Sequence, residues 1–274
     1  MQLISNQLHL EGKVIGLVPT MGYLHEGHLS LITKSKKTSD ITVVSVFVNP
    51  TQFGPKEDFG KYPRNIRRDK QLLKEAGVDY VFIPDVKEIY PDQFQTYVNV
   101  EKTTKILEGE SRPTHFRGVT TIVSMLFNVV NPDKAYFGQK DAQQAFVIRQ
   151  MARDLKFNIN IVVIPIVREK DGLALSSRNV YLSGKERTDA LVLNHSLIYA
   201  RKMIANGSKD SAKILRGMKR MINPVDSSDL DYVSIVDALT FNPVKTLKHG
   251  RKYYVLIACR IGKTRLIDNL LIKV

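Results

Sequence analysis

Residues 14–37 read VIGLVPTMGYLHEGHLSLITKSKK. The first six form a nearly continuous apolar run, which is typical of a buried strand, and the apolar residues after Gly22 recur at helical spacing. A strand that feeds directly into a helix is the unit from which parallel sheets are built. The stretch therefore predicts the first strand and the first helix of an α/β domain.

The same alternation continues to about residue 168. Strand-like runs lie at 41–49, 78–84, 134–138 and 159–167, and helical patterns at 65–77, 119–131 and 141–156. This order predicts a Rossmann-like, doubly wound parallel sheet with helices on both faces. A polar loop, a basic helical stretch over 185–221 and paired strand-like runs then predict a second, smaller α+β domain. We expect the domains at 1–168 and 169–274.

The charge balance points to an anionic partner. Of the 274 residues, 41 are Lys or Arg and 27 are Asp or Glu, which gives a net charge of +14. Residues 1–168 contribute +5 of this charge, and residues 169–274 contribute +9. Charge alone does not separate a nucleic acid, a membrane surface and a nucleotide, so the motifs must decide.

Several protein classes are disfavoured by composition. No segment approaches the ~18–20 continuous apolar residues of a membrane-spanning helix, and the N-terminus lacks the pattern of a secretion signal, which favours the cytoplasm. Cys259 is the single cysteine, so an intramolecular disulfide and a Cys-based zinc site are excluded. Because Cys259 lies in the apolar run YYVLIACRIG, we expect it to be a small buried hydrophobe.

The first motif, PTMGYLHEGH (19–28), lies at the junction of the first strand and helix. Open parallel sheets bind ligands at this edge, and the N-terminus of a helix offers free N–H groups to phosphate. His25 and His28, three residues apart, are expected to share one helix face as imidazolium donors to a triphosphate. The alternatives are a metal pair, which lacks a third ligand, and two ordinary surface histidines.

Two further motifs follow strands on the same sheet edge. In FVNPTQFG (47–54), Asn49 and Gln52 offer amides to hydroxyl and carboxylate groups, the alternative being a simple Asn-Pro turn. In FGQKDAQQ (137–144), Lys140 suits phosphate oxygens and Asp141 either approaches magnesium or caps the helix. A solvated Lys140 is the alternative there.

The fourth motif, LSSRN (175–179), follows the last strand of the first domain. Two hydroxyls and a guanidinium in a mobile loop would make a phosphate clamp that closes during turnover, whereas the alternative is a solvated linker. Four such motifs on one predicted sheet edge favour a shared ligand site.

PTMGYLHEGH, FVNPTQFG, YPR (62–64), RPTHFRGV (112–119), FGQKDAQQ and LSSRN together resemble the pantothenate synthetase family, the ATP-dependent pantoate–β-alanine ligases of the H-x-G-H nucleotidyltransferases. H-x-G-H alone is shared by many nucleotidyltransferases, whereas the full ordered set is specific to this family. The resemblance implies that the pantoate carboxylate attacks the α-phosphorus of ATP to give pantoyl adenylate and pyrophosphate. The amine of β-alanine then displaces AMP.

The resemblance also implies site residues. It makes His28 a proton donor. The further expected catalytic residues are His25, Lys140, Ser176, Ser177 and Arg178. Gln52 and Gln144 are expected to bind pantoate, with Asn49 as a further substrate-binding amide. The implied ATP contacts are Met21, Gly22, Tyr23, Leu24, His25, Glu26, Gly27, His28, Gly138, Gln139, Lys140, Asp141, Val167, Leu175, Ser176, Ser177 and Arg178. Mg²⁺ would accompany ATP, and a homodimer is expected, with the apolar run 119–130 serving as core or interface.

Two other functions remain as alternatives. A nucleotidyltransferase acting on a phosphorylated substrate would favour Arg or Lys where Gln52 and Gln144 stand. A nucleic-acid-binding protein would explain the basic charge, but the chain carries no recognisable nucleic-acid module and no Trp. We therefore expect small-molecule substrates and neither a nucleic acid nor a membrane as partner.

Overall fold

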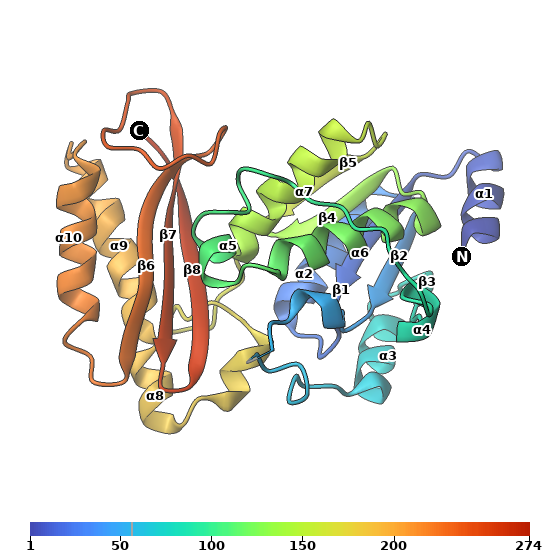
Figure 1. Cartoon of the computed structure of the whole chain (residues 1–274), viewed down its shortest axis with the longest axis horizontal. Coiled ribbons are helices and arrows are strands. Elements are labelled where there is room, and N and C mark those ends of the chain that lie inside the picture. The colour runs from blue at the N-terminus through green and yellow to red at the C-terminus, as the bar shows by residue number, and fades with distance from the viewer. Residues whose placement is uncertain (56) are drawn as a thin grey trace. The chain divides into compact units, whose positions relative to one another are not determined.

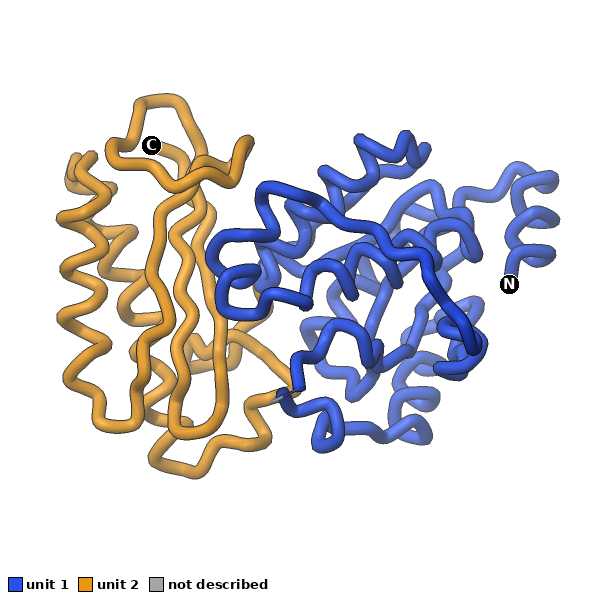
Figure 2. Tube along the Cα trace, in the orientation of Figure 1, with its two compact units in different colours: residues 1–165 blue, residues 166–274 orange. Residues whose placement is uncertain are grey.

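The computed structural model describes residues 1–55 and 57–274. The chain divides into two compact units, Met1–Pro165 and Ile166–Val274, which Figure 2 shows in different colours. The sequence patterns alone place this division near residue 168. Among the described residues, no helix combines the length and the apolar character needed to cross a bilayer.

The first unit is built on a five-stranded parallel sheet (Figure 1). Its strands, in the order β3-β2-β1-β4-β5, are β1 Ile15–Thr20, β2 Ile41–Val46, β3 Tyr80–Phe82, β4 Lys134–Gly138 and β5 Asn160–Ile164. Its helices are α1 Gln2–Leu10, α2 Glu26–Thr38, η1 Pro50–Gln52, α3 Ile66–Glu75, α4 Val86–Ile89, α5 Glu108–Ser111, α6 His115–Val130, η2 Gln139–Asp141 and α7 Ala142–Asp154. The predicted parallel α/β sheet is confirmed.

Helices cover both faces of this sheet because successive strand residues point to opposite sides. Leu17 and Val43 pack with α1, α6 and α7, whereas their neighbours Val18 and Val44 pack with α2 and α3. All four side chains are fully buried, which explains why the strands read as unbroken apolar runs. The doubly wound arrangement expected from the sequence follows from this packing.

The apolar run 119–130 belongs mainly to the core of the first unit. Val119, Ile122, Val123, Leu126, Phe127 and Val130 are all at most 5% exposed and share one cluster. The helix that carries them begins at His115, before the apolar pattern starts, and Thr114 at its N-cap makes no side-chain capping hydrogen bond.

Two strands are shorter than their apolar runs. β3 pairs with β2 only through the partners of residues 43–45, so the expected strand over 78–84 is reduced to three residues at the sheet edge. β5 ends at Ile164, where its pairing with β4 also ends. Strand length here is set by the partner strand, which a single run of sequence does not reveal.

The second unit is the predicted smaller α+β domain. It holds an antiparallel sheet in the order β6-β7-β8 (Ser228–Asp237, Lys252–Ile261, Thr264–Lys273) and the helices η3 Ser177–Tyr181, α8 Gly184–Asp189, α9 Leu191–Ala205 and α10 Ser211–Ile222. Leu193 and Leu197 of α9 and Ile214 and Met218 of α10 pack in one core cluster with the sheet. Cys259 on β7 is fully buried, as expected, and burial raises the pKa of its thiol to about 11.

Candidate active site

The strand order places the switch point of the sheet between β1 and β4. From β1 the chain proceeds through β2 to β3 at one edge, and then returns to the other side of β1 as β4. Crevices beyond the carboxyl ends of strands at such a point are the usual ligand sites of open α/β sheets. Three of the four motifs follow β1, β2 and β4 at this edge.

After β1 the chain makes a tight turn with left-handed backbone at two residues. Gly22 has φ +79° and Tyr23 has φ +49°. A Cβ atom on Gly22 would lie 3.0 Å from the Asp69 carboxylate and 3.1 Å from a methyl of Val46, so glycine meets both a conformational and a spatial requirement.

Asp69 of α3 fixes this turn from outside the motif. Its carboxylate, 1% exposed, accepts the N–H groups of Tyr23 and Leu24, both at 2.8 Å. Arg68 donates to the carbonyl of Leu24 at 2.9 Å. Sequence reasoning missed both residues, because Asp69 lies among the charges of an apparently exposed helix and no local pattern marks it as buried.

The two histidines form a reciprocal cap rather than a pair on one helix face. His25 is the N-cap of α2 with extended backbone, and its Nδ1 accepts the N–H of Gly27 at 3.1 Å. Nδ1 of His28 accepts the N–H of His25 at 3.3 Å, and the ring centroids are 4.1 Å apart. Since each Nδ1 is an acceptor, a neutral ring carries its hydrogen on Nε2.

This cap corrects the expectation of free main-chain N–H groups at the start of α2. The N–H of Gly27 is taken by His25, and the N–H groups of His28 and Leu29 both donate to the carbonyl of His25, at 2.8 and 3.1 Å. Because the N–H groups of Tyr23 and Leu24 donate to Asp69, these main-chain donors are already used within the protein, and side chains must supply most donors to a ligand here.

The expectation of imidazolium rings is also wrong. Desolvation, followed by the charge of Lys140, lowers the pKa of His25 to about 4. Desolvation, His25 and Lys140 lower the pKa of His28 to about 3. Both rings are therefore neutral at pH 7, and Lys140 is the positive charge beside them.

Lys140 lies in the turn after β4. η2 joins β4 directly to α7, and Lys140 Nζ lies 3.2 Å from Asp141 Oδ2. Asp141 occupies the N-cap position of α7, but its side chain makes no capping hydrogen bond, so the capping alternative is not supported. Gln144, in the first turn of α7, is half-buried.

The neighbouring amide, Gln143, is structural. It is 4% exposed, and its Nε2 donates to the carbonyls of Thr103 and Ile106 at 2.7 and 2.8 Å. Its Oε1 accepts the N–H of Glu108 at 3.1 Å. Gln143 thereby ties the segment before α5 to α7.

Asn49 and Gln52, after β2, have different surroundings. Asn49 is 1% exposed; its Nδ2 donates to Gln52 Oε1 and to the carbonyl of Gly118, both at 3.1 Å. Its Oδ1 accepts the hydroxyls of Tyr90 (2.7 Å) and Thr51 (2.9 Å). The polar atoms of Asn49 are thus used within the protein, and Asn49 orients Gln52.

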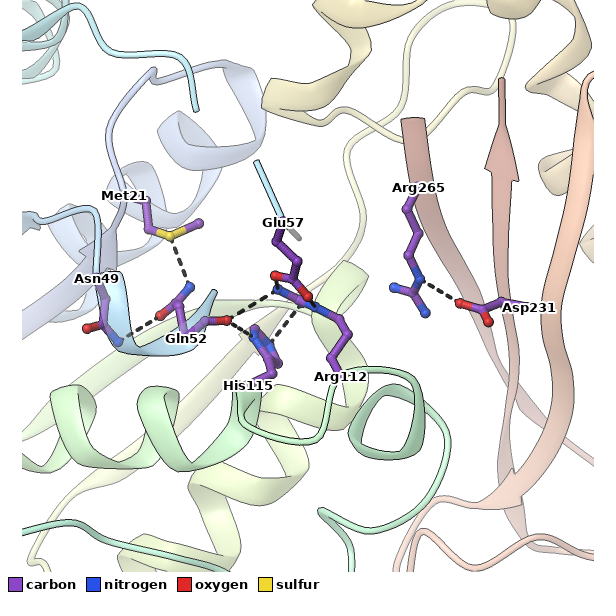
Figure 3. A network of polar contacts seen from close by, with 8 residues as sticks. All are labelled: Met21, Asn49, Gln52, Glu57, Arg112, His115, Asp231 and Arg265. Atoms are coloured by element: carbon purple, nitrogen blue, oxygen red, sulfur yellow. Dashed lines mark hydrogen bonds and ion pairs between the residues drawn. The ribbon is translucent and has the colours of Figure 1, made fainter. Parts of the chain in front are cut away.

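The main chain of Gln52 is held by residues just before and at the start of α6. Figure 3 shows His115 and Arg112 directed at the Gln52 carbonyl, with His115 Nδ1 at 3.0 Å and Arg112 Nη2 at 3.4 Å. Glu57 accepts Arg112 Nε at 2.7 Å and Nη2 at 2.6 Å. The motif RPTHFRGV contains Arg112 and His115, but nothing in its sequence indicates that they contact Gln52.

The fourth motif lies in the second unit. Leu175 donates its N–H to the Val167 carbonyl at 3.1 Å, so these two predicted nucleotide contacts face each other across a short hairpin. The segment expected as a loop forms the 3-10 helix η3, whose N-cap Ser176 accepts the N–H of Arg178 at 3.2 Å. Ser177 is buried.

Comparisons with known proteins agree over almost the full length. The family model described as pantoate-beta-alanine ligase matches residues 1–271. A pantothenate synthetase of Acetivibrio thermocellus is 56% identical over 99% of this chain and 96% of its own. Another, of Caldicellulosiruptor saccharolyticus, is 53% identical over 100% of this chain and 97% of its own.

Solved structures give the same result. The pantothenate synthetase of Thermus thermophilus superposes with a TM-score of 0.91 at 46% identity, over 97% of this chain and 96% of its own. A pantoate-beta-alanine ligase of Francisella tularensis, complexed with beta-gamma ATP and beta-alanine, gives a TM-score of 0.79 at 35% identity, over 98% and 94%. This chain belongs to the pantoate–β-alanine ligase family.

Proposed function

We propose that this ligase joins pantoate to β-alanine in two steps, through a pantoyl adenylate made from ATP. The observation that carries the proposal is the placement of two neutral histidines and Lys140 at the ends of β1 and β4, with the Gln52 amide at the end of β2. Activation is required because a free carboxylate is a poor acyl donor, whereas AMP is a good leaving group.

In the first step a carboxylate oxygen of pantoate attacks the α-phosphorus of ATP, and pyrophosphate leaves. We assign Nε2–H of His28, with that of His25, as hydrogen-bond donors to the phosphoryl oxygens on which charge accumulates. Lys140 supplies the positive charge. The low pKa of His28 favours a neutral donor over the proton donor that the family resemblance suggested.

We assign pantoate to the amides. Gln52 uses Oε1 as acceptor for Asn49 and one N–H for the sulfur of Met21 at 3.0 Å, so its second N–H suits an oxygen of the hydroxy acid. Gln144 would take another oxygen. In the second step the β-alanine amine attacks the acyl carbon, AMP leaves with the bond electrons, and the ammonium proton passes to solvent.

The remaining nucleotide contacts stay predictions. They are Met21–Gly27, Gly138, Gln139 and Asp141 in the first unit and Val167, Leu175, Ser176, Ser177 and Arg178 in the second. The role of the second unit as a basic lid stays a prediction as well. Mg²⁺ also stays a prediction, as part of the MgATP substrate, because proteins usually hold it through one or two carboxylates together with substrate phosphates. A homodimer and a cytoplasmic location also remain predictions.

Isotope transfer tests the proposal. The purified chain is incubated with MgATP, β-alanine and D-pantoate labelled with ¹⁸O in its carboxylate. One labelled oxygen per turnover should appear in AMP, and pyrophosphate release should depend on pantoate. Unlabelled AMP would exclude the acyl adenylate, and pantoate-independent pyrophosphate release would exclude pantoate as the acid.

A further inference from the structure

We infer that Glu57, Arg112 and His115 are positioning residues for pantoate, because they hold the main chain of Gln52 and thereby aim its side-chain N–H. None of the three is assigned here to contact a substrate, and each acts through Gln52. The inference rests on the proposed function, since it concerns the amide to which pantoate is assigned.

The hydrogen positions in this network follow from its geometry. The Gln52 carbonyl can only accept, so the His115 Nδ1 at 3.0 Å must carry a hydrogen. Desolvation, with the charge of Arg112, lowers the pKa of His115 to about 4, so the ring is neutral and its Nε2 is an acceptor. Arg112 Nη1 lies 3.3 Å from this Nε2 and donates to it. Arg112 therefore fixes the tautomer that lets His115 donate to Gln52.

Glu57 orients Arg112 in turn. Its two oxygens accept Nε and Nη2 in the parallel fork that matches guanidinium geometry. Burial by itself would raise the pKa of Glu57, but the hydrogen bonds and charge of Arg112 outweigh burial and lower it. A charged fork of this kind fixes the rotation of the guanidinium, which a lysine at position 112 could not reproduce.

Gln52 is then constrained at both ends. Its carbonyl accepts His115 and Arg112, and its Oε1 accepts Asn49. Gly118 brings α6 so close that a Cβ there would lie 2.5 Å from the Thr51 carbonyl and 2.6 Å from the Gln52 nitrogen. With both ends held, the direction of the remaining N–H is set before substrate arrives, which reduces the entropy lost on binding.

Glu57 also lies among residues that follow Gln52 and pack around Phe53. Its N–H donates to the carbonyl of Gly54 at 3.0 Å, and the ring of Phe53 contacts those of Phe59 and Tyr62 at centroid distances of 5.3 and 5.8 Å. Phe53 thus packs against Phe59 and Tyr62, and the Glu57 carboxylate joins this part of the chain to Arg112, between α5 and α6. Removing the charge of Glu57 should weaken its link to Arg112 without disturbing the apolar core of the first unit.

The test compares Michaelis constants in pantoate-dependent pyrophosphate exchange. Glu57→Gln, Arg112→Lys and His115→Phe should each raise KM for pantoate about tenfold, as expected for one lost charge-assisted or buried hydrogen bond, with KM for ATP within about twofold of the parent. His115→Asn, whose amide can donate from near the Nδ1 position, should restore much of the loss. Glu101→Gln, which removes an exposed carboxylate paired with Lys105, is the matched control.

A double-mutant cycle separates positioning from general damage. In a Gln52→Ala background Arg112→Lys should have little further effect on KM for pantoate, because its route of action is already lost. Additive effects, unchanged KM for pantoate in all three variants, or equal rises for pantoate and ATP would overturn the inference. Lack of pantoate-dependent exchange in the unmodified chain would overturn the ligase proposal itself, and thermal unfolding identifies any variant that has not folded.

Discussion

Two turns at the same sheet edge differ in how much of their stabilisation is local. In residues 20–28, after β1, the histidines cap main-chain groups only two and three positions away. In residues 47–53, after β2, Gln52 is held by Arg112 and His115, which are 60 and 63 positions away, and Asn49 donates to Gly118 at a separation of 69. The first turn thus combines local caps with the distant carboxylate of Asp69, whereas the second depends on the docking of α6.

The fold sets a protonation state at the first turn and a side-chain direction at the second. At the first turn the fold mainly sets a chemical state, because desolvation and Lys140 keep His25 and His28 neutral. At the second turn the functional group is an amide that does not titrate, so the fold sets only its direction. Substitutions at the first turn should therefore affect the rate of the chemical step, and those at the second should affect pantoate affinity.

The largest effect is expected at His28. His28→Ala removes a donor to the phosphoryl group and should lower kcat for pyrophosphate exchange by about 100- to 1000-fold. His28→Gln should retain clearly more activity, because an amide N–H can stand near Nε2 without transferring a proton. If the two variants are equally inactive while folded, as judged by circular dichroism, the neutral-donor role is excluded.

Asp69 tests how far the first turn supports itself. Asp69→Ala leaves the N–H groups of Tyr23 and Leu24 without their acceptor, which should lower the free energy of unfolding by about 1–3 kcal/mol. The relaxed turn should also reduce kcat/KM for ATP about tenfold, because the histidines lose their fixed geometry. Urea unfolding and initial rates measure the two effects.

Asp133→Ala is the control for Asp69, because Asp133 accepts the N–H of Ile15 at 2.7 Å at the opposite end of β1. It should reduce stability but leave kcat/KM for ATP nearly unchanged. An equal loss of kcat/KM in both variants would show that the effect of Asp69 is only on stability.

Gly118 tests the dependence of the second turn on α6. Gly118→Ala forces a methyl against the backbone of Thr51 and Gln52, so we expect a loss of about 1–3 kcal/mol in stability, as for other overpacked sites. KM for pantoate should rise several-fold, with kcat less affected. Gly60→Ala is the matched control, since its Cβ would meet no atom within 4 Å; similar results for both variants would contradict close packing at Gly118.

The last prediction is a pH dependence of stability. The folded pKa values of His25 and His28, about 4 and 3, lie below the ordinary 6.5 of an unfolded chain, so the unfolded state binds more protons between these values. Their contribution is therefore complete above about pH 6.5 and decreases as the pH falls toward 4. Urea unfolding from pH 8 to pH 4.5 should show a shallower decrease for His28→Gln than for the parent, and parallel curves would contradict the burial of a neutral ring.

Much of the fold was predictable because local signals agree with it. The run VIGLVP and the helical spacing after Gly22 predicted β1 and α2 because both faces of the sheet are covered and the helix has one apolar face. The start of α6 at His115 and the short β3 were not predictable in the same way, since the first lies before the apolar pattern and the second is limited by its partner strand.

Some residues of the site could likewise be predicted from the sequence, and others could not. His25, His28, Lys140 and Gln52 stand in motifs at strand ends, so their presence at one sheet edge follows from the order of strands and helices in the chain. Asp69 and Glu57 carry no such signal, because a buried carboxylate and a solvated one have the same local sequence. The sequence also suggested charged histidines. That expectation was wrong because the local sequence does not reveal the burial and the neighbouring Lys140 charge that lower their pKa values.

By itself, then, the sequence determined a parallel α/β sheet and the groups gathered at its carboxyl edge, because apolar periodicity and Gly-containing turns are local properties. The tertiary structure alone decided that His25 and His28 are neutral and that the carbonyl of Gln52 is held by Arg112 and His115. Protonation depends on desolvation and neighbouring charge, and hydrogen bonds across 60 residues depend on helix docking. Both arise only when distant parts of the chain pack together.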